Sequence, residues 1–283
     1  MGPGGDHDGI ETYMKELDSA GIPFSVKNVD VYDELDLAVN LSLASGVKHT
    51  IVFRFTGYDN LDYTKPAAQE ADNLWQTVMN ALAKIPTFNK QIVWLELINE
   101  PAKEQADWLG QFGVECAQKA LAQGYKIAMF AWSTGTPFVG AAGDPYNSWE
   151  TPGMLAYLKL CAENPDRIAV SLHEYSLDND HLMTGFPYLL GRFQFLLDTC
   201  DNHTIAHPTI IMSEWGWGAD DLPSPDQGLS QLGQIAALYA KYPTILGAML
   251  WYLGPGFGGI AGKADQYVLP MANYTLTHTF PEA

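Results

Sequence analysis

Short apolar runs alternate with amphipathic helical stretches along the chain, and this alternation constrains the fold more than any other feature of the sequence. The runs are rich in β-branched and aromatic residues and almost continuously apolar, as in strands buried on both faces. We expect seven such strands, at 24–30, 50–56, 92–98, 126–131, 168–173, 209–214 and 246–252. Helical patterns lie between them, at 9–20, 33–45, 68–85, 104–123, 152–163, 186–200 and 229–241. Repeated strand–helix units predict a parallel sheet, and therefore an α/β fold.

The parallel sheet can close in two ways, as a doubly wound sheet or as a TIM (β/α)8 barrel. A doubly wound sheet usually carries a glycine-rich phosphate-binding turn after an early strand, and none follows 24–30 or 50–56. Polar and aromatic residues instead end many different strands, which is the pattern of a barrel. These residues are Asp30, Arg54, Asn99, Glu100, Trp132, His173, Tyr175, Glu214 and Trp251. No Ser/Gly-rich linker interrupts the pattern, so we predict one (β/α)8-barrel domain over residues 1–283.

The charge balance excludes several classes of partner. The chain has 33 Asp and Glu residues against 15 Lys and Arg, a formal net charge of −18. Such an acidic protein repels phosphate, so we expect neither nucleic acid nor a membrane surface as a partner. No apolar run approaches the ~18 residues of a membrane span. No signal peptide is recognisable in this chain, which leaves the cytoplasm, or secretion with the signal removed, as locations.

Two glutamates end strongly apolar strands, which is a costly position for a charge. Glu100 closes the run in WLELINEPA, and Glu214 closes the run in TIIMSEWGWG. A carboxylate in such a place is poorly solvated unless a base pairs with it. Only 15 basic residues are available in the chain, so we interpret both glutamates as candidates for catalysis. Glu96 has the parity of a barrel-interior residue and needs a partner, for which Arg54 and Lys27 are candidates.

Four motifs stand in a fixed order along the chain: Asn99-Glu100-Pro101, His173-Glu174-Tyr175, Ser213-Glu214-Trp215-Gly216 and, at the end of the last strand, Trp251. Two predicted strands, 126–131 and 168–173, separate the first motif from the third. In this order and spacing the motifs resemble those of the (β/α)8-barrel retaining glycosidases of glycoside hydrolase clan A. In that clan an Asn-Glu-Pro ends strand 4, a His and a Tyr end strand 6, a Glu ends strand 7 and a Trp ends strand 8. The resemblance covers roughly residues 8–280.

The resemblance implies a role for each residue of these motifs. Glu100 would be the acid/base and Glu214 the nucleophile of a retaining hydrolysis, which uses two carboxyl groups ~5–5.5 Å apart. Asn99 would hydrogen-bond the 2-hydroxyl of the sugar. Tyr175 would hold the nucleophile and His173 would orient that network. Trp251 would form a stacking floor under the sugar ring; the alternative for it, as for His173, is a place in the core.

Arg54 and Trp132 are further candidates for binding substrate. Arg54 ends a strand and would support the nucleophile, but the clan usually carries such an arginine on strand 2, and the count here puts Arg54 on strand 3. Trp132, like Trp149, Trp215 and Trp217, either lines a sugar cleft or packs in the core.

The predicted reaction needs no metal or organic cofactor, because the two carboxylates do the chemistry. Cys116, Cys161 and Cys200 show neither metal-ligand nor disulfide spacing, so we interpret them as small buried apolar residues. We predict an enzyme that hydrolyses neutral β-linked poly- or oligosaccharides. Two alternatives stay open: a non-catalytic carbohydrate-binding barrel, and a metal-dependent barrel hydrolase, for which the sequence offers no His/Asp cluster.

The strand count departs from the resemblance in one place. If Glu100 ends strand 4 and Glu214 ends strand 7, then 24–30 is strand 2, and only MGPGGDHD precedes the helix at 9–20. The barrel is therefore predicted to lack its first strand in this chain. The tail, 264–283, is expected to be the last helix, with Pro270 near its start; the alternative is a strand over NYTLTHTF that fills the gap. An open gap would expose two strand edges and favour a homodimer or pairing with another segment.

Overall fold

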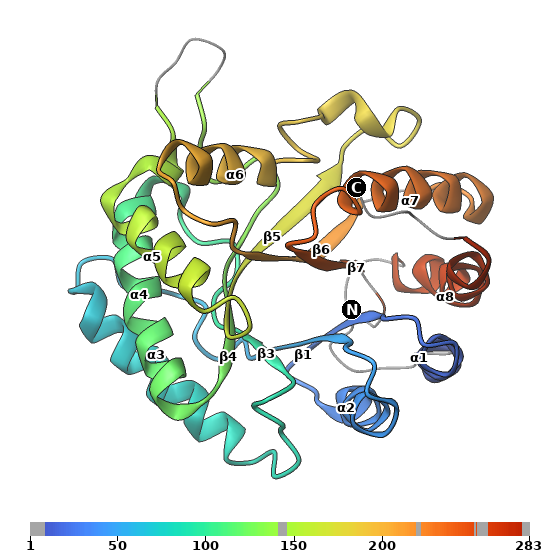
Figure 1. The fold of residues 1–283 in the computed structure, drawn as a ribbon, viewed down its shortest axis with the longest axis horizontal. Coiled ribbons are helices and arrows are strands. Elements are labelled where there is room, and N and C mark those ends of the chain that lie inside the picture. Colours follow the sequence, from blue (N-terminus) through green and yellow to red (C-terminus); the bar gives the residue numbers. More distant parts are fainter. Residues whose placement is uncertain (1–8, 141–145, 219–221, 252, 254–259, 279–283) are drawn as a thin grey trace.

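Strands and helices alternate along the chain in the computed structural model, with the strands in the centre and the helices outside them (Figure 1). The structure describes residues 9–140, 146–218, 222–251, 253 and 260–278. The strands are β1 (Ser25–Val29), β2 (Thr50–Arg54), β3 (Trp94–Glu96), β4 (Lys126–Trp132), β5 (Ile168–Ser176), β6 (Thr209–Trp217) and β7 (Ile245–Leu250). The α-helices are α1 (Ile10–Ser19), α2 (Asp33–Ser45), α3 (Ala67–Leu82), α4 (Ala106–Gln123), α5 (Pro152–Glu163), α6 (Phe193–Asn202), α7 (Pro225–Tyr239) and α8 (Ile260–Thr277).

All the strands form one sheet, whose spatial order is the order of the chain from β1 to β7. Every neighbouring pair is parallel. The predicted strands and the α/β fold are confirmed: the sheet curls into a nearly closed TIM barrel that lacks one strand. One interior layer of apolar side chains comes from β2 to β7 and consists of Val52, Trp94, Ala128, Ala169, Ile211 and Met249. Because the strands are parallel, their carboxyl ends meet at a single mouth.

Glycines end three of the predicted helices in the left-handed conformation that most other residues avoid. Gly46 and Gly124 are the C-caps of α2 and α4, with φ of 78° and 74°, and Gly21 follows α1 with φ of 73°. The buried positions predicted for the cysteines are also confirmed. All three are free thiols in the helix layer, on α4, α5 and α6.

Two helix starts differ from the prediction. α6 begins at Phe193 rather than near residue 186, because Pro187 has no amide hydrogen for a helix and Gly191 has φ of 79°. α7 begins earlier than expected, at Pro225. The Ser224 side chain accepts a hydrogen bond from the Gln227 amide and so caps this helix, and a proline suits its first position.

The tail forms the last helix, α8, as predicted, and not the alternative strand. Pro270 lies inside α8 rather than near its start, since the helix already begins at Ile260. No helix in the described part of the chain is long and apolar enough to cross a membrane.

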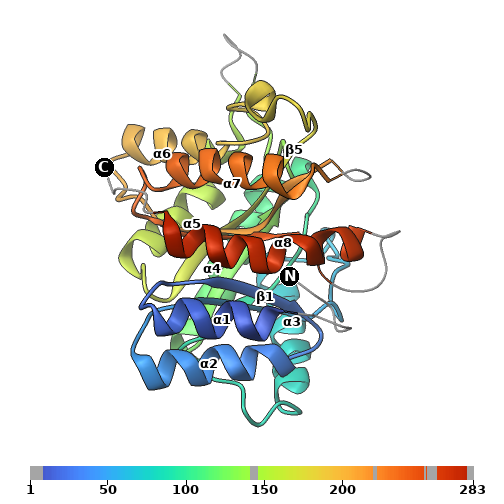
Figure 2. The same ribbon diagram turned by 90° about the vertical axis from the view of Figure 1, so that its right-hand side faces the viewer.

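The side of the barrel between β1 and β7 lies under helices from both ends of the chain. α7, α8 and α1 lie side by side over it (Figure 2). Among the described residues, β1 pairs only with β2 and β7 only with β6, and no strand lies between them. The two open strand edges expected from the sequence are therefore present beneath a layer of helices.

Candidate active site

Glu214 lies on β6, with its side chain buried in the mouth of the barrel. Only 8% of the side chain is exposed. Its Oε1 lies 3.2 Å from Lys27 Nζ, and its Oε2 accepts a hydrogen bond of 2.8 Å from the Tyr175 hydroxyl. Burial by itself raises the pKa of Glu214, but the charge of Lys27, the neighbouring His173 and these hydrogen bonds outweigh it and lower the pKa below its ordinary value. The site therefore holds Glu214 as a carboxylate.

Lys27, which contacts the Glu214 carboxylate, also forms a buried ion pair with Glu96. The Lys27 ammonium on β1 is fully buried and lies 2.5 Å from Glu96 Oε1 on β3, so Lys27 and not Arg54 is the partner of Glu96. One cation thus faces two carboxylates, Glu96 and Glu214, in the interior of the barrel. Removing such a cation leaves buried charge without compensation, which makes Lys27 costly to replace.

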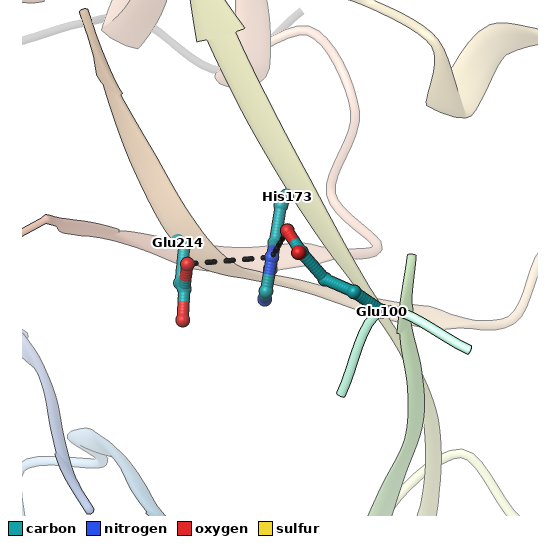
Figure 3. Close-up of side chains that lie close together, drawn as sticks. All are labelled: Glu100, His173 and Glu214. Carbon is teal, nitrogen blue, oxygen red and sulfur yellow. Dashed lines mark hydrogen bonds and ion pairs between the residues drawn. The ribbon is translucent and has the colours of Figure 1, made fainter. Parts of the chain in front are cut away.

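Glu100 follows β3 and is far more open than Glu214. Its side chain is 41% exposed. The φ angle of Glu100 is 45°, and its amide donates a hydrogen bond to the Ala131 carbonyl. Ala131 itself has a φ of 41° and lies at the irregular end of β4. Left-handed backbone at non-glycine residues is uncommon and concentrates at functional sites. The strained turn directs the Glu100 side chain toward the mouth, where it meets a histidine (Figure 3).

His173, near the end of β5, lies between the two glutamates (Figure 3). Its Nδ1 lies 3.0 Å from Glu100 Oε1 and 3.3 Å from Glu214 Oε2. The hydrogen bond from His173 is the largest cause of a lowered pKa at Glu100, and burial opposes it; Ser133 also lowers this pKa and Glu214 raises it. The imidazole therefore links the ionisation of both carboxyl groups.

The alternation of β5 sends its three polar residues to two different places. His173 and Tyr175 face the mouth. Glu174, between them, faces the helix layer, where its carboxylate accepts hydrogen bonds from the Gly191 and Arg192 amides and from the Tyr239 hydroxyl. Glu174 thus fixes α6 and α7 against β5, and its burial raises its pKa. It is a structural residue behind the site.

Gly216 gives the Tyr175 ring its place beside the nucleophile candidate. The two residues are partners in the register of β5 and β6. A Cβ added to Gly216 would come within 3.2 Å of the Tyr175 ring and 3.4 Å of the Trp251 carbonyl oxygen. A larger residue would push the tyrosine hydroxyl away from Glu214.

Trp251 and Asn99 also lie at the carboxyl ends of the strands. The Trp251 ring meets the Tyr175 ring edge-on, with 6.0 Å between centroids, and its amide donates to the Trp215 carbonyl. Asn99 directly precedes Glu100, and its Oδ1 is buried without a hydrogen-bond partner among the described residues. An unsatisfied acceptor or amide at this position is available to a ligand.

Two other candidates lie away from these contacts. Arg54 pairs with Asp59 at 2.7 Å, and no contact between Arg54 and Glu214 is found among the described residues. Trp132 is fully buried and packs near Phe130 and Trp149, with ring centroids 5.6 and 6.4 Å away. Trp149, Trp215 and Trp217 are buried as well. The structure therefore places the four tryptophans in the core.

One group in the described part of the chain has the geometry to hold a metal ion. Oxygen and nitrogen atoms of Glu100, His173 and Glu214 all lie within 4.8 Å of one another. His173 Nδ1 brings the three together, through its hydrogen bond with Glu100 and its 3.3 Å approach to Glu214 Oε2.

The sequence offered Lys27, beside Arg54, only as a candidate partner of Glu96, and its contact with Glu214 was not predicted. Ser133, which lowers the pKa of Glu100, was also missed. A sequence pattern did point to Lys27. It is the one cation in the strand SVKNV, and alternation places its side chain on the same face as those of Ser25 and Val29. For Ser133, in the loop after β4, no sequence pattern pointed to the site.

The comparison with solved structures concerns the fold. An endo-β-1,4-glucanase from Xanthomonas axonopodis pv. citri is 12% identical, with a TM-score of 0.51 over 97% of this chain and 92% of its own. The Clostridial cellulose synthase subunit Z from Clostridioides difficile is 15% identical, with a TM-score of 0.50 over 95% and 92%. The chain shares the fold of these proteins. The barrel that the sequence motifs implied is thus confirmed, whereas no protein-family model and no curated protein matches the chain.

Proposed function

We propose that the protein is a retaining glycoside hydrolase that cleaves β-linked neutral poly- or oligosaccharides. One observation carries the proposal: carboxylate oxygens of Glu100, in the turn after β3, and of Glu214, on β6, lie within 4.8 Å of each other. Retaining hydrolysis needs carboxyl groups ~5–5.5 Å apart, whereas inverting hydrolysis leaves room for water at ~6.5–9.5 Å.

The difference between the two carboxyl groups supports their assignment. Glu214, buried and kept ionised beside Lys27, attacks the anomeric carbon and forms a glycosyl–enzyme bond as the bond to the leaving oxygen breaks. Glu100, the more exposed group, donates a proton to that oxygen. It then takes a proton from the water that hydrolyses the intermediate.

Proton donation requires Glu100 to be protonated, yet the His173 hydrogen bond lowers its pKa. The leaving oxygen of a bound sugar competes with His173 for Glu100. We infer that substrate binding releases Glu100 from His173 and so raises its pKa, which lets it hold the proton that it donates. Once Glu214 is glycosylated, its charge no longer raises the pKa of Glu100, which suits the role of Glu100 as a base in the second step.

Neighbouring side chains are suited to bind the sugar. Asn99, with its unsatisfied Oδ1 beside Glu100, would bond the 2-hydroxyl, a contact that strengthens in the transition state. The Tyr175 hydroxyl fixes Glu214 Oε2, and Trp251, against Tyr175, would support the sugar ring. The net charge of −18 favours an uncharged substrate, and the endoglucanase of similar fold is named for a neutral β-linked glucan.

A panel of soluble β-glucans, β-mannans and aryl β-glycosides tests the proposal. We expect release of reducing sugar from at least one member, unchanged by a chelator, with the β-anomer as the first product by proton NMR. A first product of the α-anomer would contradict retention. Activity that a chelator abolishes would favour a metal-dependent hydrolase.

The alternative is a non-catalytic carbohydrate-binding barrel. One observation favours it, the contact between Glu100 and His173. The lowered pKa of Glu100 is unfavourable for a general acid. Binding of a glycan from the panel without any turnover, over the whole pH range in which the protein stays folded, would establish that alternative.

A further inference from the structure

Glu96 of β3 holds a charge in the interior of the barrel, apart from the two proposed catalytic carboxyl groups. Its side chain is 0% exposed, and so is that of Lys27, the cation with which it pairs. In the described part of the chain, this ion pair is the only polar contact of the Glu96 carboxylate. A buried ion pair is often no more stable than apolar side chains of similar volume, so stability alone does not explain a glutamate at this position.

The Lys27 ammonium is shared unequally between two carboxylates. Its Nζ lies 2.5 Å from Glu96 Oε1 and 3.2 Å from Glu214 Oε1. An ammonium has three donors, so it can contact both groups at once. Because the lysine side chain is long and flexible, the closer contact with Glu96 fixes where its charge lies relative to Glu214.

The charge of Glu96 also acts at the mouth of the barrel. Burial raises the pKa of the Tyr175 hydroxyl, and the charge of Glu96 raises it further, as do those of the two proposed catalytic carboxylates. This hydroxyl donates its hydrogen bond to Glu214 Oε2. The charged and titratable groups around Glu214 are Lys27 of β1, Glu96 of β3, Glu100 in the turn after β3, and His173 and Tyr175 of β5.

A count of charges shows what Glu96 does during the reaction. Before it, Lys27, Glu96 and Glu214 together carry one excess negative charge. When a Glu214 oxygen bonds to the anomeric carbon and the bond to the leaving oxygen breaks, the carboxylate becomes a neutral ester. Lys27 and Glu96 then remain as a neutral pair. Without Glu96, the same step would leave Lys27 as a buried cation with no partner, which is costly.

We propose that Glu96 is a positioning residue that holds Lys27 beside Glu214 and keeps the Lys27 charge compensated while the sugar is attached. Its negative charge also repels that of Glu214, and this repulsion disappears when Glu214 forms the bond. Glu96 thereby makes Glu214 a better nucleophile from a fully buried position. This role rests on the proposed function, since only a covalent intermediate removes the charge of Glu214.

A ¹³C NMR titration measures the coupling between the two carboxylates without any turnover. The protein is labelled at the carboxyl carbons of its glutamate side chains, and Glu214→Gln assigns the resonance of Glu214. In Glu96→Gln, Lys27 serves Glu214 alone and the repelling charge is gone. Both changes favour the ionised form, so we expect the pKa of Glu214 to fall. An unchanged or higher pKa of Glu214 would overturn the proposal.

Two further variants separate the charge of Glu96 from its packing. Glu96→Asp keeps the charge and should hold the pKa of Glu214 near that of the unchanged protein, a result that also decides the matter if Glu96→Gln does not fold. Glu70→Gln replaces another buried glutamate, on α3, which accepts a hydrogen bond from Tyr58. It should leave the titration of Glu214 unchanged. A lower pKa of Glu214 in either of these two variants would contradict a role of the Glu96 charge.

Stopped-flow absorbance with a 2,4-dinitrophenyl β-glycoside of the sugar found in the panel then separates the two chemical steps. Glu96→Gln should slow formation of the glycosyl–enzyme about ten- to a hundredfold, because this step leaves Lys27 without a partner. It should slow hydrolysis of the intermediate little or not at all, because hydrolysis restores the Glu214 carboxylate. A side chain needed only for packing would slow both steps alike, and that result would overturn the proposal.

Failure of this proposal and failure of the proposed function give different results. If the unchanged protein turns over no glycoside, the proposed function fails, and the role of Glu96 in that reaction fails with it. If the unchanged protein is active but the pKa of Glu214 does not respond to Glu96→Gln, the proposed function stands and only the role of Glu96 is wrong.

Discussion

Glu100 and Glu214 are chemically identical side chains that the barrel places in opposite environments. Glu214 is 8% exposed and has contacts with Lys27, Tyr175 and His173. Glu100 is 41% exposed, lies on a strained turn and bonds mainly to His173. One group is fixed in position and charge, and the other can exchange protons with its surroundings. In the proposed reaction these are the requirements of a nucleophile and of an acid/base.

The largest effect is expected from Glu214→Ala, because no other group can form the glycosyl–enzyme bond. Turnover of an aryl β-glycoside should fall on the order of 10⁴-fold or more. Glu163→Ala, at an exposed position of α5, is the matched control and should leave turnover unchanged. Retained activity in a folded Glu214→Ala protein would remove the proposed nucleophile.

The loss of turnover in Glu100→Gln should depend on the leaving group of the substrate, whereas the loss in Glu214→Ala should not. With a poor leaving group, which needs protonation, turnover should fall ~10²–10⁴-fold. With 2,4-dinitrophenolate, which leaves without a proton, the first step should be nearly normal, seen as a burst in stopped-flow absorbance. A uniform loss with both substrates would contradict the acid role.

Lys27→Met tests the environment of Glu214, the carboxylate that is fixed in position and charge. Loss of the buried cation leaves Glu96 and Glu214 uncompensated, so we expect the free energy of unfolding to fall by about 3–5 kcal/mol in urea titrations. Lys15→Met, in an exposed pair with Glu11, should cost at most about 1 kcal/mol. Similar losses in the two variants would show that Lys27 does not stabilise the interior. The double variant Lys27→Met/Glu96→Leu should recover part of the loss.

His173→Asn should have the smallest effect on rate, on the order of ten- to a hundredfold in kcat, and a clear effect on pH dependence. His173 lowers the pKa of both glutamates, so its removal raises both. Glu214 then ionises at higher pH and Glu100 stays protonated to higher pH. Both limbs of the kcat/KM profile should therefore move upward.

The matched control for this pH profile is His203→Asn, which removes a histidine paired with Glu150 on the surface. It should leave the profile unchanged. A downward movement of either limb in His173→Asn, or a similar movement in the control, would contradict the linkage through His173.

The elements that the sequence predicted best are those with strong local signals. Every strand was found because buried parallel strands are continuously apolar, and Gly46 and Gly124 marked helix ends through their conformation. The start of α6 was misjudged because an apolar pattern from residue 186 outweighed Pro187. Local sequence carries little information on which of two such signals prevails.

The candidate site was predicted where it rests on strand ends, and missed where it rests on contacts across the barrel. Glu100 follows β3, and His173 and Glu214 lie in the carboxyl-terminal halves of β5 and β6, where the alternation of side chains brings them together. The contact of Lys27 with Glu214 joins β1 to β6, and its partner choice over Arg54 depends on the tilt and closure of the barrel. Such distances follow from packing, which no single strand encodes.

The central claim is tested most directly by trapping the glycosyl–enzyme intermediate. The protein is incubated with a 2,4-dinitrophenyl 2-deoxy-2-fluoro-β-glycoside of the sugar found in the panel, and its peptides are mapped by mass spectrometry. The account predicts a single fluoroglycosyl adduct on the peptide that contains Glu214, at the side-chain carboxylate. An adduct on Glu100, or steady turnover of active substrates with no adduct at any carboxylate, would contradict it.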